Sequence, residues 1–233
     1  MQELCQRSLW LGAYVPGWAQ NDSAKFQSHE FESITYLLHF AVFVRPNGRL
    51  DLRSNGLTRS KMRSLVAVGH DSGRKVLLVV GGEGASEGLR IAWNSKNLTR
   101  TVRTLINLVE MYGYDGIDLD WEPFPRLDAQ LYVEAIKSLR RNLDEISRRR
   151  TGTRVLSAAI EVDINDPVYM RSLTQSLASI RGYLDQVNLR NCLLYGTIRL
   201  SILVEAHLSM DSELLMQTRQ FAPSLSPGFN PIN

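Results

Sequence analysis

Short, almost wholly apolar segments alternate with longer amphipathic segments over most of the 233-residue chain. The apolar segments are near-continuous runs of Val, Ile and Leu, which is typical of strands covered on both faces. They predict strands over 9–15, 34–44, 75–80, 116–121, 154–161 and 186–189. The amphipathic segments predict helices over 23–31, 58–68, 98–112, 129–150 and 167–183. This alternation predicts an α/β fold with a parallel sheet and right-handed crossovers, closed into a barrel or left open and doubly wound.

The number of strand-helix units limits the size of such a sheet. At about 30 residues or more per unit, the chain up to Tyr195 accommodates about six strands, whereas a complete eight-stranded barrel takes about 250 residues. After Asn191 the sequence offers one helix near 209–219 and a Pro/Ser/Asn-rich end, but no clean pair of further strands. We therefore expect a single domain over 1–233 whose last part, 190–233, is atypical.

The composition excludes several classes of protein. A hydrophobic fraction of 44% with 22% charged residues is that of a globular chain with a real core. Only Cys5 and Cys192 are cysteines, which excludes a disulfide scaffold. No apolar run reaches the roughly 18–20 residues of a membrane helix, and a net charge of +3 from mixed signs is weak support for nucleic-acid binding. We expect a monomer that binds neither membranes nor nucleic acid. The first residues lack a signal-peptide pattern, so we expect a chain that is cytoplasmic, already trimmed or cut short.

The segment 114–122, YDGIDLDWE, holds most of the functional information. Read as a strand, it places Asp118, Asp120 and Glu122 on one face and the three apolar residues between them on the other. Because the apolar face packs against helices, the acids point inward. Three acids in a low-dielectric interior stabilise a fold poorly, but they shift one another's pKa values. A carboxyl with a raised pKa at a strand end is what general acid catalysis requires.

Other interpretations of the polar motifs are weaker. The acids would bind magnesium or cap the next element if they lay in a loop, but strict alternation and Pro123 after the strand argue against a loop. The run of glycines at 81–84 resembles a phosphate loop without its Lys-Ser/Thr pair, so a tight turn is the better interpretation. The four histidines, His29, His39, His70 and His207, show no metal-ligand spacing, and we predict no metal site.

The acidic run resembles the D-x-x-D-x-D-x-E signature of the family-18 glycoside hydrolases, the chitinases and related endo-β-N-acetylglucosaminidases. The signature is highly specific, and it is matched at Asp115, Asp118, Asp120 and Glu122. Weaker similarities extend the match over about 9–189. Residues 11–14 resemble the family's first strand with its inward Tyr, and 39–43 resemble its second strand. Residues 77–82 resemble the third-strand S-x-G-G motif with Val79 in place of the Ser, and 185–189 resemble the sixth strand.

The resemblance implies a (β/α)8 TIM barrel, here incomplete, and retaining hydrolysis of β-1,4-linked N-acetylglucosamine with the substrate's acetamido group as nucleophile. By this resemblance Glu122 is the general acid and base, Asp120 orients the acetamido group, and Asp118 tunes Asp120. The implied partner is chitin or an N-acetylglucosamine oligosaccharide, no cofactor is required, and secretion is common in the family. The candidate substrate-binding residues are Tyr14, Trp18, Phe43, Gly82 and Asp115. Ordinary packing is an equally good interpretation for Trp18, as it is for Trp93.

The family pattern breaks near residue 189. Cys192 stands where the family has the Tyr of a Met-x-Tyr-Asp element, Tyr195 lies three positions further on, and no Trp follows Trp121 to form the floor under the cleaved sugar. Either the end of the chain has diverged or it is truncated or frame-shifted, and the abruptness of the loss favours the second. Three hypotheses follow: an active chitinase-type hydrolase, a lectin-like protein that binds chitin without turnover, and an inactive fragment.

Overall fold

The computed structural model describes residues 11–20, 31, 34–122, 124, 126–149, 152–161 and 165–190. Within these residues the strands form one sheet in the order β1-β2-β4-β5-β6-β7, which is the order of the chain, and every neighbouring pair in that series is parallel. The short β3 pairs antiparallel with β2. The strands are β1 (Gly12–Pro16), β2 (Tyr36–Val44), β3 (Leu50–Asp51), β4 (Lys75–Gly81), β5 (Gly116–Asp120), β6 (Val155–Glu161) and β7 (Gln186–Arg190).

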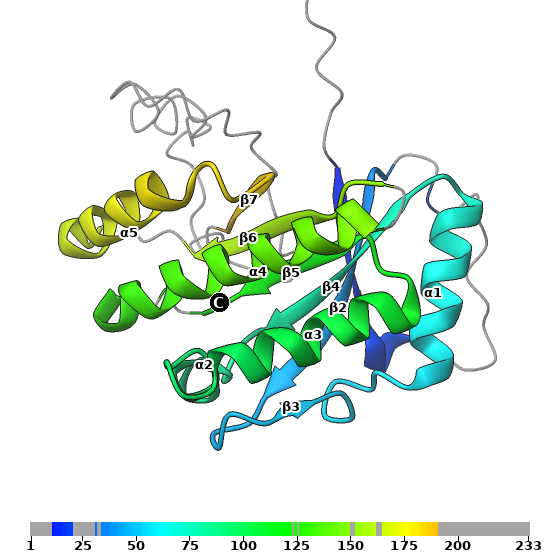
Figure 1. Ribbon diagram of the computed structural model, residues 1–233, viewed down its shortest axis with the longest axis horizontal. Helices are drawn as coiled ribbons and strands as arrows, with labels where there is room; N and C mark the ends of the chain where they lie inside the picture. Colours follow the sequence, from blue (N-terminus) through cyan, green and yellow to red (C-terminus); the bar gives the residue numbers. More distant parts are fainter. Residues whose placement is uncertain are drawn as a thin grey trace, which may run out of the picture.

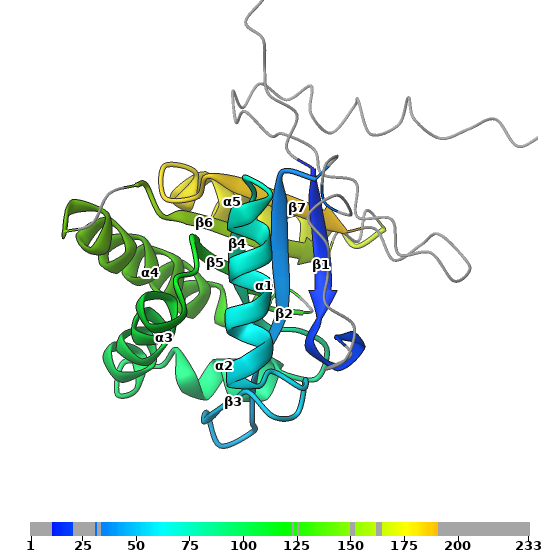
Figure 2. The same ribbon diagram turned by 90° about the vertical axis from the view of Figure 1, so that its right-hand side faces the viewer.

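The helices connect successive parallel strands and cover the outer face of the sheet. They are α1 (Arg59–Asp71), α2 (Ser86–Ala92), α3 (Leu98–Tyr112), α4 (Ala129–Arg149) and α5 (Pro167–Ile180), with single 3-10 turns η1 (Gly17–Ala19) and η3 (Arg126–Asp128). In Figures 1 and 2, α1, α3 and α4 lie along one side of the curled sheet, and β1 lies on the side away from α3 and α4. The architecture is a curled half-barrel, which confirms the predicted incomplete (β/α)8 barrel.

The predicted strands and the helices over 58–68, 98–112, 129–150 and 167–183 match the observed elements, with differences at their ends. The structure adds α2 and β3, which the sequence analysis missed. The predicted helix over 23–31 lies almost entirely outside the described residues, and the helix near 209–219 lies wholly outside them.

The two faces of the sheet bury different sets of side chains. On the outer face Val76, Leu78, Ile117 and Leu119 join the inner sides of the helices in the main hydrophobic core. On the inner face a smaller cluster contains buried residues such as Leu38, Leu77 and Val79, with Tyr14 and Phe40 packed against it. Burial on both faces explains why these strands are near-continuous apolar runs in the sequence.

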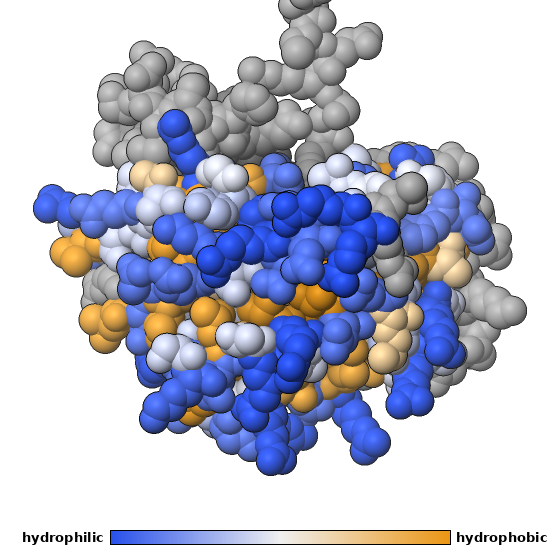
Figure 3. Space-filling view, viewed as in Figure 1, coloured by the Kyte–Doolittle hydropathy of each residue, from blue (hydrophilic) through white to orange (hydrophobic). Residues whose placement is uncertain are grey.

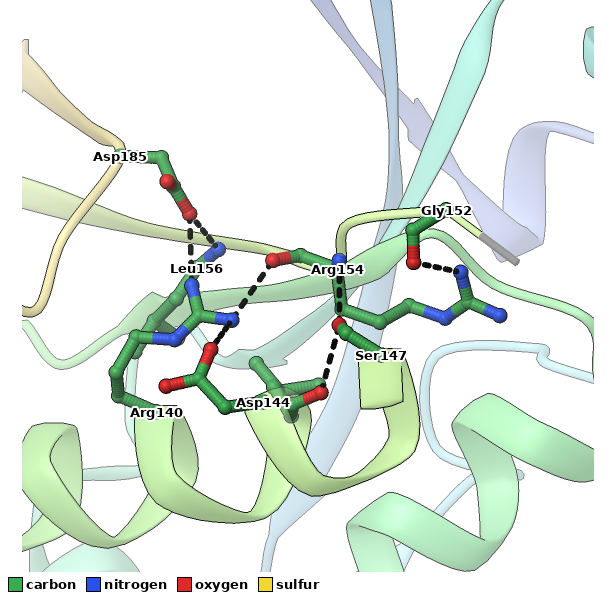
Figure 4. Close-up of polar contacts among 8 residues, drawn as sticks. Arg140, Asp144, Ser147, Gly152, Arg154, Leu156 and Asp185 are labelled. Carbon is green, nitrogen blue, oxygen red and sulfur yellow. Dashed lines mark hydrogen bonds and ion pairs between the residues drawn. The ribbon is translucent and has the colours of Figure 1, made fainter. Parts of the chain in front are cut away.

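A buried arginine joins α4 to the amino ends of β6 and β7 (Figure 4). The Arg140 guanidinium contacts Asp185 at 2.9 Å and Asp144 at 2.7 Å, and donates to the Arg154 carbonyl oxygen at 2.8 Å. The same Asp185 carboxylate accepts a hydrogen bond from the Leu156 amide at 2.8 Å. Because both carboxylates are about half exposed, solvent screens these ion pairs, and each stabilises by only about 0.3–1 kcal/mol. The amino end of the sheet is therefore occupied by structural contacts.

The outer surfaces of α3 and α4 carry mostly hydrophilic side chains, with a strip of hydrophobic surface between the two helices (Figure 3). Among the helices that the structure describes, none is long and apolar enough to cross a membrane.

Candidate active site

The three acids of β5 and the residues just after it lie towards the carboxyl end of the sheet, where the loops after all the parallel strands converge. Asp118 and Asp120 are completely buried, while Glu122, just after the strand, is partly exposed. Ile117 and Leu119 belong to the main core under the helices. The alternation expected from the sequence is thus present, and the two Asp side chains face the barrel interior.

Asp118 is the centre of a hydrogen-bond network that joins four strands. Its carboxylate accepts hydrogen bonds from the Tyr14 hydroxyl at 3.1 Å, from Ser157 Oγ at 2.5 Å and from Asn188 Nδ2 at 3.2 Å. Asn188 Nδ2 also lies 3.5 Å from the Tyr14 hydroxyl, so the first and last described strands meet across the interior. Hydrogen bonds from several donors favour the ionised form of a buried carboxylate and fix its orientation.

Sequence reasoning missed Ser157 and Asn188. Ser157 is paired directly with Asp118 in the β5–β6 register, and Asn188 is paired with Ala159 on the next strand. A polar residue in the middle of an otherwise apolar predicted strand was the available signal, but only the register places each one beside Asp118.

Two glycines at the carboxyl end of β4, Gly81 and Gly82, bring the backbone close to Asp120. A Cβ on Gly81, whose φ is +113°, would lie 2.1 Å from the Asp120 carbonyl oxygen. The Gly82 amide donates to that same oxygen at 2.8 Å. A Cβ on Gly82 would lie 2.6 Å from Cζ of Phe40. The glycine turn therefore fixes the backbone of the acidic strand, which is a structural reason for Gly82 beside the acids.

The chain around Glu122 is anchored on both sides by buried aromatic rings. Trp121 is 1% exposed and its ring lies 6.2 Å from that of Tyr132, while Phe124 lies 5.2 Å from the same ring. Ser86 Oγ, at the start of α2, donates to the Glu122 carbonyl oxygen at 2.7 Å. These contacts hold the backbone of Glu122, which is partly exposed as a residue although its Oε1 atom is buried.

The pKa of Tyr132 is affected by the negative charges of the buried acids. Burial raises the pKa of the Tyr132 hydroxyl, and the negative charges of Asp118 and Asp120 raise it further. Within the described part of the chain, that hydroxyl has no hydrogen-bond partner. The hydroxyl therefore stays protonated next to the acids.

Aromatic side chains line the rim between β1 and β4. Trp18, in η1, is 60% exposed and meets Phe40 edge to face at 5.7 Å. Phe40 in turn meets Tyr14 at 6.2 Å. Because Tyr14 also bonds Asp118, this row of rings leads from the solvent to the acids. Trp93, in contrast, is 1% exposed and cannot offer a face to a sugar, so packing is its role.

Two other candidate residues lie away from the acids. Phe43 packs against the main core under the helices, and its backbone pairs with Asp51 of β3. Asp115 precedes β5 at the opposite end of the sheet, where it contacts His70 Nε2 at 2.8 Å and accepts from the Val76 amide at 2.8 Å. The structure thus brings together Tyr14, Trp18, Gly82 and the three acids, but not these two.

Across the described ranges, no three His, Cys, Asp or Glu side chains cluster as a metal site requires. Cys192 and Tyr195 lie outside the described residues.

An incomplete parallel barrel with acids at the carboxyl end of one strand has the architecture of barrel glycosidases. The chain belongs to the glycosyl hydrolases family 18, because the model of that family matches residues 11–220. The match extends past residue 189, where the resemblance by motif ends.

Three relatives show the extent of the similarity. Probable chitinase 10 of Drosophila melanogaster is 28% identical over 112 residues, which are 45% of this chain and 5% of that protein. A chitinase-like effector of Moniliophthora perniciosa is 28% identical over 110 residues, 47% of this chain and 25% of that protein. The crystal structure of a chitinase from Rhizomucor miehei superimposes with a TM-score of 0.60 at 22% identity, covering 78% of this chain and 56% of that one. The matched part of this chain thus spans a quarter or less of the curated relatives and about half of the solved chitinase.

Proposed function

We propose that the protein is a chitinase-type hydrolase that cleaves β-1,4-linked N-acetylglucosamine polymers. The observation that carries the proposal is the intact acid series of a family-18 chain: Asp118 and Asp120 are fully buried, and Glu122 reaches the partly exposed rim. A partly exposed acidic residue at the carboxyl end of a barrel strand is positioned to exchange a proton with a bound glycoside.

In the proposed mechanism Glu122 donates its proton to the glycosidic oxygen as the bond to the anomeric carbon breaks. The acetamido carbonyl oxygen of the same sugar attacks that carbon and forms an oxazolinium-type intermediate. Asp120 accepts the acetamido N–H hydrogen bond and offsets the developing positive charge. The Glu122 carboxylate then takes a proton from water, whose oxygen attacks the anomeric carbon, so that the configuration is retained.

Asp118 acts through Asp120 in this proposal. It lies on the same face of β5, one side-chain repeat (about 6.5–7 Å) deeper in the barrel. Its three donors, Tyr14, Ser157 and Asn188, hold the carboxylate in place and favour its negative charge. A fixed negative charge on Asp118 disfavours a full negative charge on Asp120. A hydrogen bond from the acetamido N–H would offset this repulsion, so Asp120 would bind the acetamido group more strongly.

For substrate binding we propose the rim that contains Tyr14, Trp18 and Gly82. The exposed Trp18 suits the apolar face of a sugar, while Gly82 packs against the Phe40 ring and holds the Asp120 backbone beside this rim. We assign packing and strand-end roles to Phe43 and Asp115, because their contacts lie away from the acids. We further propose that 1–233 is one domain and acts as an exported monomer.

The first test compares Glu122→Gln with wild type on N-acetylglucosamine oligomers. Removing the transferable proton is expected to lower turnover by about 10²–10⁴-fold, the range of a positioned acid. Asp120→Asn is expected to fall in the same range, and Asp118→Asn to lose less. The matched control is Glu145→Gln, which makes the same change at an exposed position on α4. Equal turnover by Glu122→Gln and wild type would refute the proposed function.

The second test concerns the nucleophile. Wild-type protein is assayed on an N-acetylated oligosaccharide and on its de-N-acetylated analogue. Because the analogue lacks the acetamido oxygen, it should not be cleaved. Comparable cleavage of both substrates would show that the assigned mechanism is wrong even if the acids are catalytic.

Binding without turnover is the second candidate function. It is favoured by Val79, which occupies the register position next to Asp118 where the family motif has a Ser, and by the relative named as a chitinase-like effector. Calorimetric titration with a hexamer of N-acetylglucosamine, followed by analysis of the products, separates the two functions. Tight binding with the hexamer recovered intact would favour this second function.

A further inference from the structure

Behind the aromatic rim lies a row of three buried polar side chains that the proposed mechanism does not use. Gln20 Nε2 lies 2.6 Å from His39 Nε2, and His39 Nδ1 lies 2.7 Å from the Tyr114 hydroxyl. His39 and Tyr114 are completely buried, and Gln20 is 5% exposed. The three residues come from the turn after β1, from the middle of β2 and from the residues just before β5.

The donors and acceptors of this row are complementary. An amide nitrogen only donates, so His39 Nε2 accepts from Gln20, and Nδ1 carries the proton that is donated to Tyr114. Burial, with Lys61 nearby, lowers the pKa of His39 to about 3, so the ring is neutral near pH 7. A neutral ring in one tautomer is therefore locked between its two partners.

Gln20 closes the turn that carries Trp18. It is the residue directly after η1, so its hydrogen bond to His39 holds the carboxyl end of that turn. At the other end, Lys61 Nζ donates to the Gly17 carbonyl oxygen at 3.1 Å. A Cβ on Gly17 would lie 2.4 Å from the Asn55 carbonyl oxygen, so the turn also lies tightly against the neighbouring loop.

We propose that Gln20, His39 and Tyr114 are positioning residues that fix the Trp18 indole on the rim, and that they thereby set a preference for oligosaccharides long enough to reach it. The inference rests on the proposed function, because it takes Trp18 as a platform for a sugar. Trp18 is 60% exposed and its ring has one described ring contact, with Phe40, so its orientation depends strongly on the backbone that carries it. If that backbone is loosened, ordering the ring on binding opposes association.

The experiment uses near-isosteric variants that remove single hydrogen bonds. Gln20→Met removes the bond to His39, and Tyr114→Phe removes the acceptor for His39 Nδ1. Gln130→Met is the matched control, because it makes the same change at an exposed position on α4. Trp18→Ala identifies which oligomers contact the Trp18 ring. The shortest N-acetylglucosamine oligomer whose Kd rises in this variant, and all longer ones, are then called the long oligomers.

For these long oligomers, we expect Gln20→Met and Tyr114→Phe to raise Kd and KM by about tenfold with little change in kcat. Shorter oligomers should bind as they do to wild type. Combined with Trp18→Ala, Gln20→Met should add nothing further, because both changes act through the same ring. Equal losses for short and long oligomers, or full additivity with Trp18→Ala, would overturn the inference.

A ligand-free measurement separates this inference from the proposed function. The Trp18 indole N–H signal in a ¹⁵N NMR spectrum, assigned with Trp18→Phe, should shift and show greater mobility in Gln20→Met and remain unchanged in Gln130→Met. If wild type neither binds nor cleaves any oligomer, the proposed function fails while this signal still tests the anchoring. An indole signal that is unchanged in Gln20→Met would refute the anchoring itself.

Discussion

Acidification should destabilise this protein through His39 in a pH window set by the structure. The ring is completely buried between Gln20 and Tyr114, and its pKa is lowered from 6.5 to about 3. Between these two values the unfolded chain binds a proton at His39 and the folded chain does not. Stability is therefore unaffected by His39 above about pH 6.5, falls as the pH decreases through the window, and levels off below about pH 3.

The size of the effect follows from the two pKa values. At pH 4 the solution is about 2.5 pH units below the pKa of His39 in the unfolded chain. Each unit is worth about 1.4 kcal/mol in favour of the unfolded state, so the free energy of unfolding is about 3 kcal/mol lower at pH 4 than at pH 7. This is a large part of the about 5–15 kcal/mol that stabilises an ordinary domain. The carboxylates also titrate below pH 5, so the contribution of His39 has to be isolated by a variant.

The assay is urea unfolding at several pH values between 4 and 7, followed by tryptophan fluorescence. His39→Gln keeps a neutral hydrogen-bonding group but cannot gain a proton in this range, so it should lose about 3 kcal/mol less than wild type on acidification. Gln130→Met, at an exposed position on α4, is the control: it changes no titratable group and should follow wild type. Equal pH slopes for wild type and His39→Gln, or protonation of His39 near pH 6 in the folded protein by NMR, would refute the reasoning.

Two further predictions concern the contacts that fix the acids. Gly81→Ala should destabilise the protein by about 3 kcal/mol, because its Cβ would meet the Asp120 carbonyl oxygen at 2.1 Å; under the proposed function it should also lower turnover by about 100-fold. Gly73→Ala, at a φ of +70° with nothing within 4 Å, should lose only the conformational part, and equal stability losses in urea unfolding would contradict this. Ser157→Ala should cost about 1.5–3 kcal/mol, because it removes a buried donor to a carboxylate. In a double-mutant cycle most of that cost should disappear when Asp118→Asn is already present, and an additive cycle would show that the two side chains are not coupled.

The sequence predicted the elements with long, regular patterns and missed the short ones. Helix α4 and the strand that carries the acids were recognised because their apolar residues recur at the helical and strand periods. Helix α2 has seven residues with Gly88 among them, which is too short for a periodic pattern. The two-residue β3 exists because it pairs with β2, and no local pattern records that pairing.

Within the candidate site, the sequence alone determined which side of β5 the acids occupy, since alternation along a strand is a local property of the backbone. Only the tertiary structure decided what surrounds them. The contact of Asp118 with Ser157 and Asn188 depends on the register of three strands, and the separation of Asp115 from the inward-facing acids depends on the direction of β5. Likewise, Trp18 is exposed and Trp93 buried because of what other segments place around each ring. Periodicity assigns a side chain to a face of its own strand or helix, whereas its neighbours are set by the packing of segments far apart in the chain.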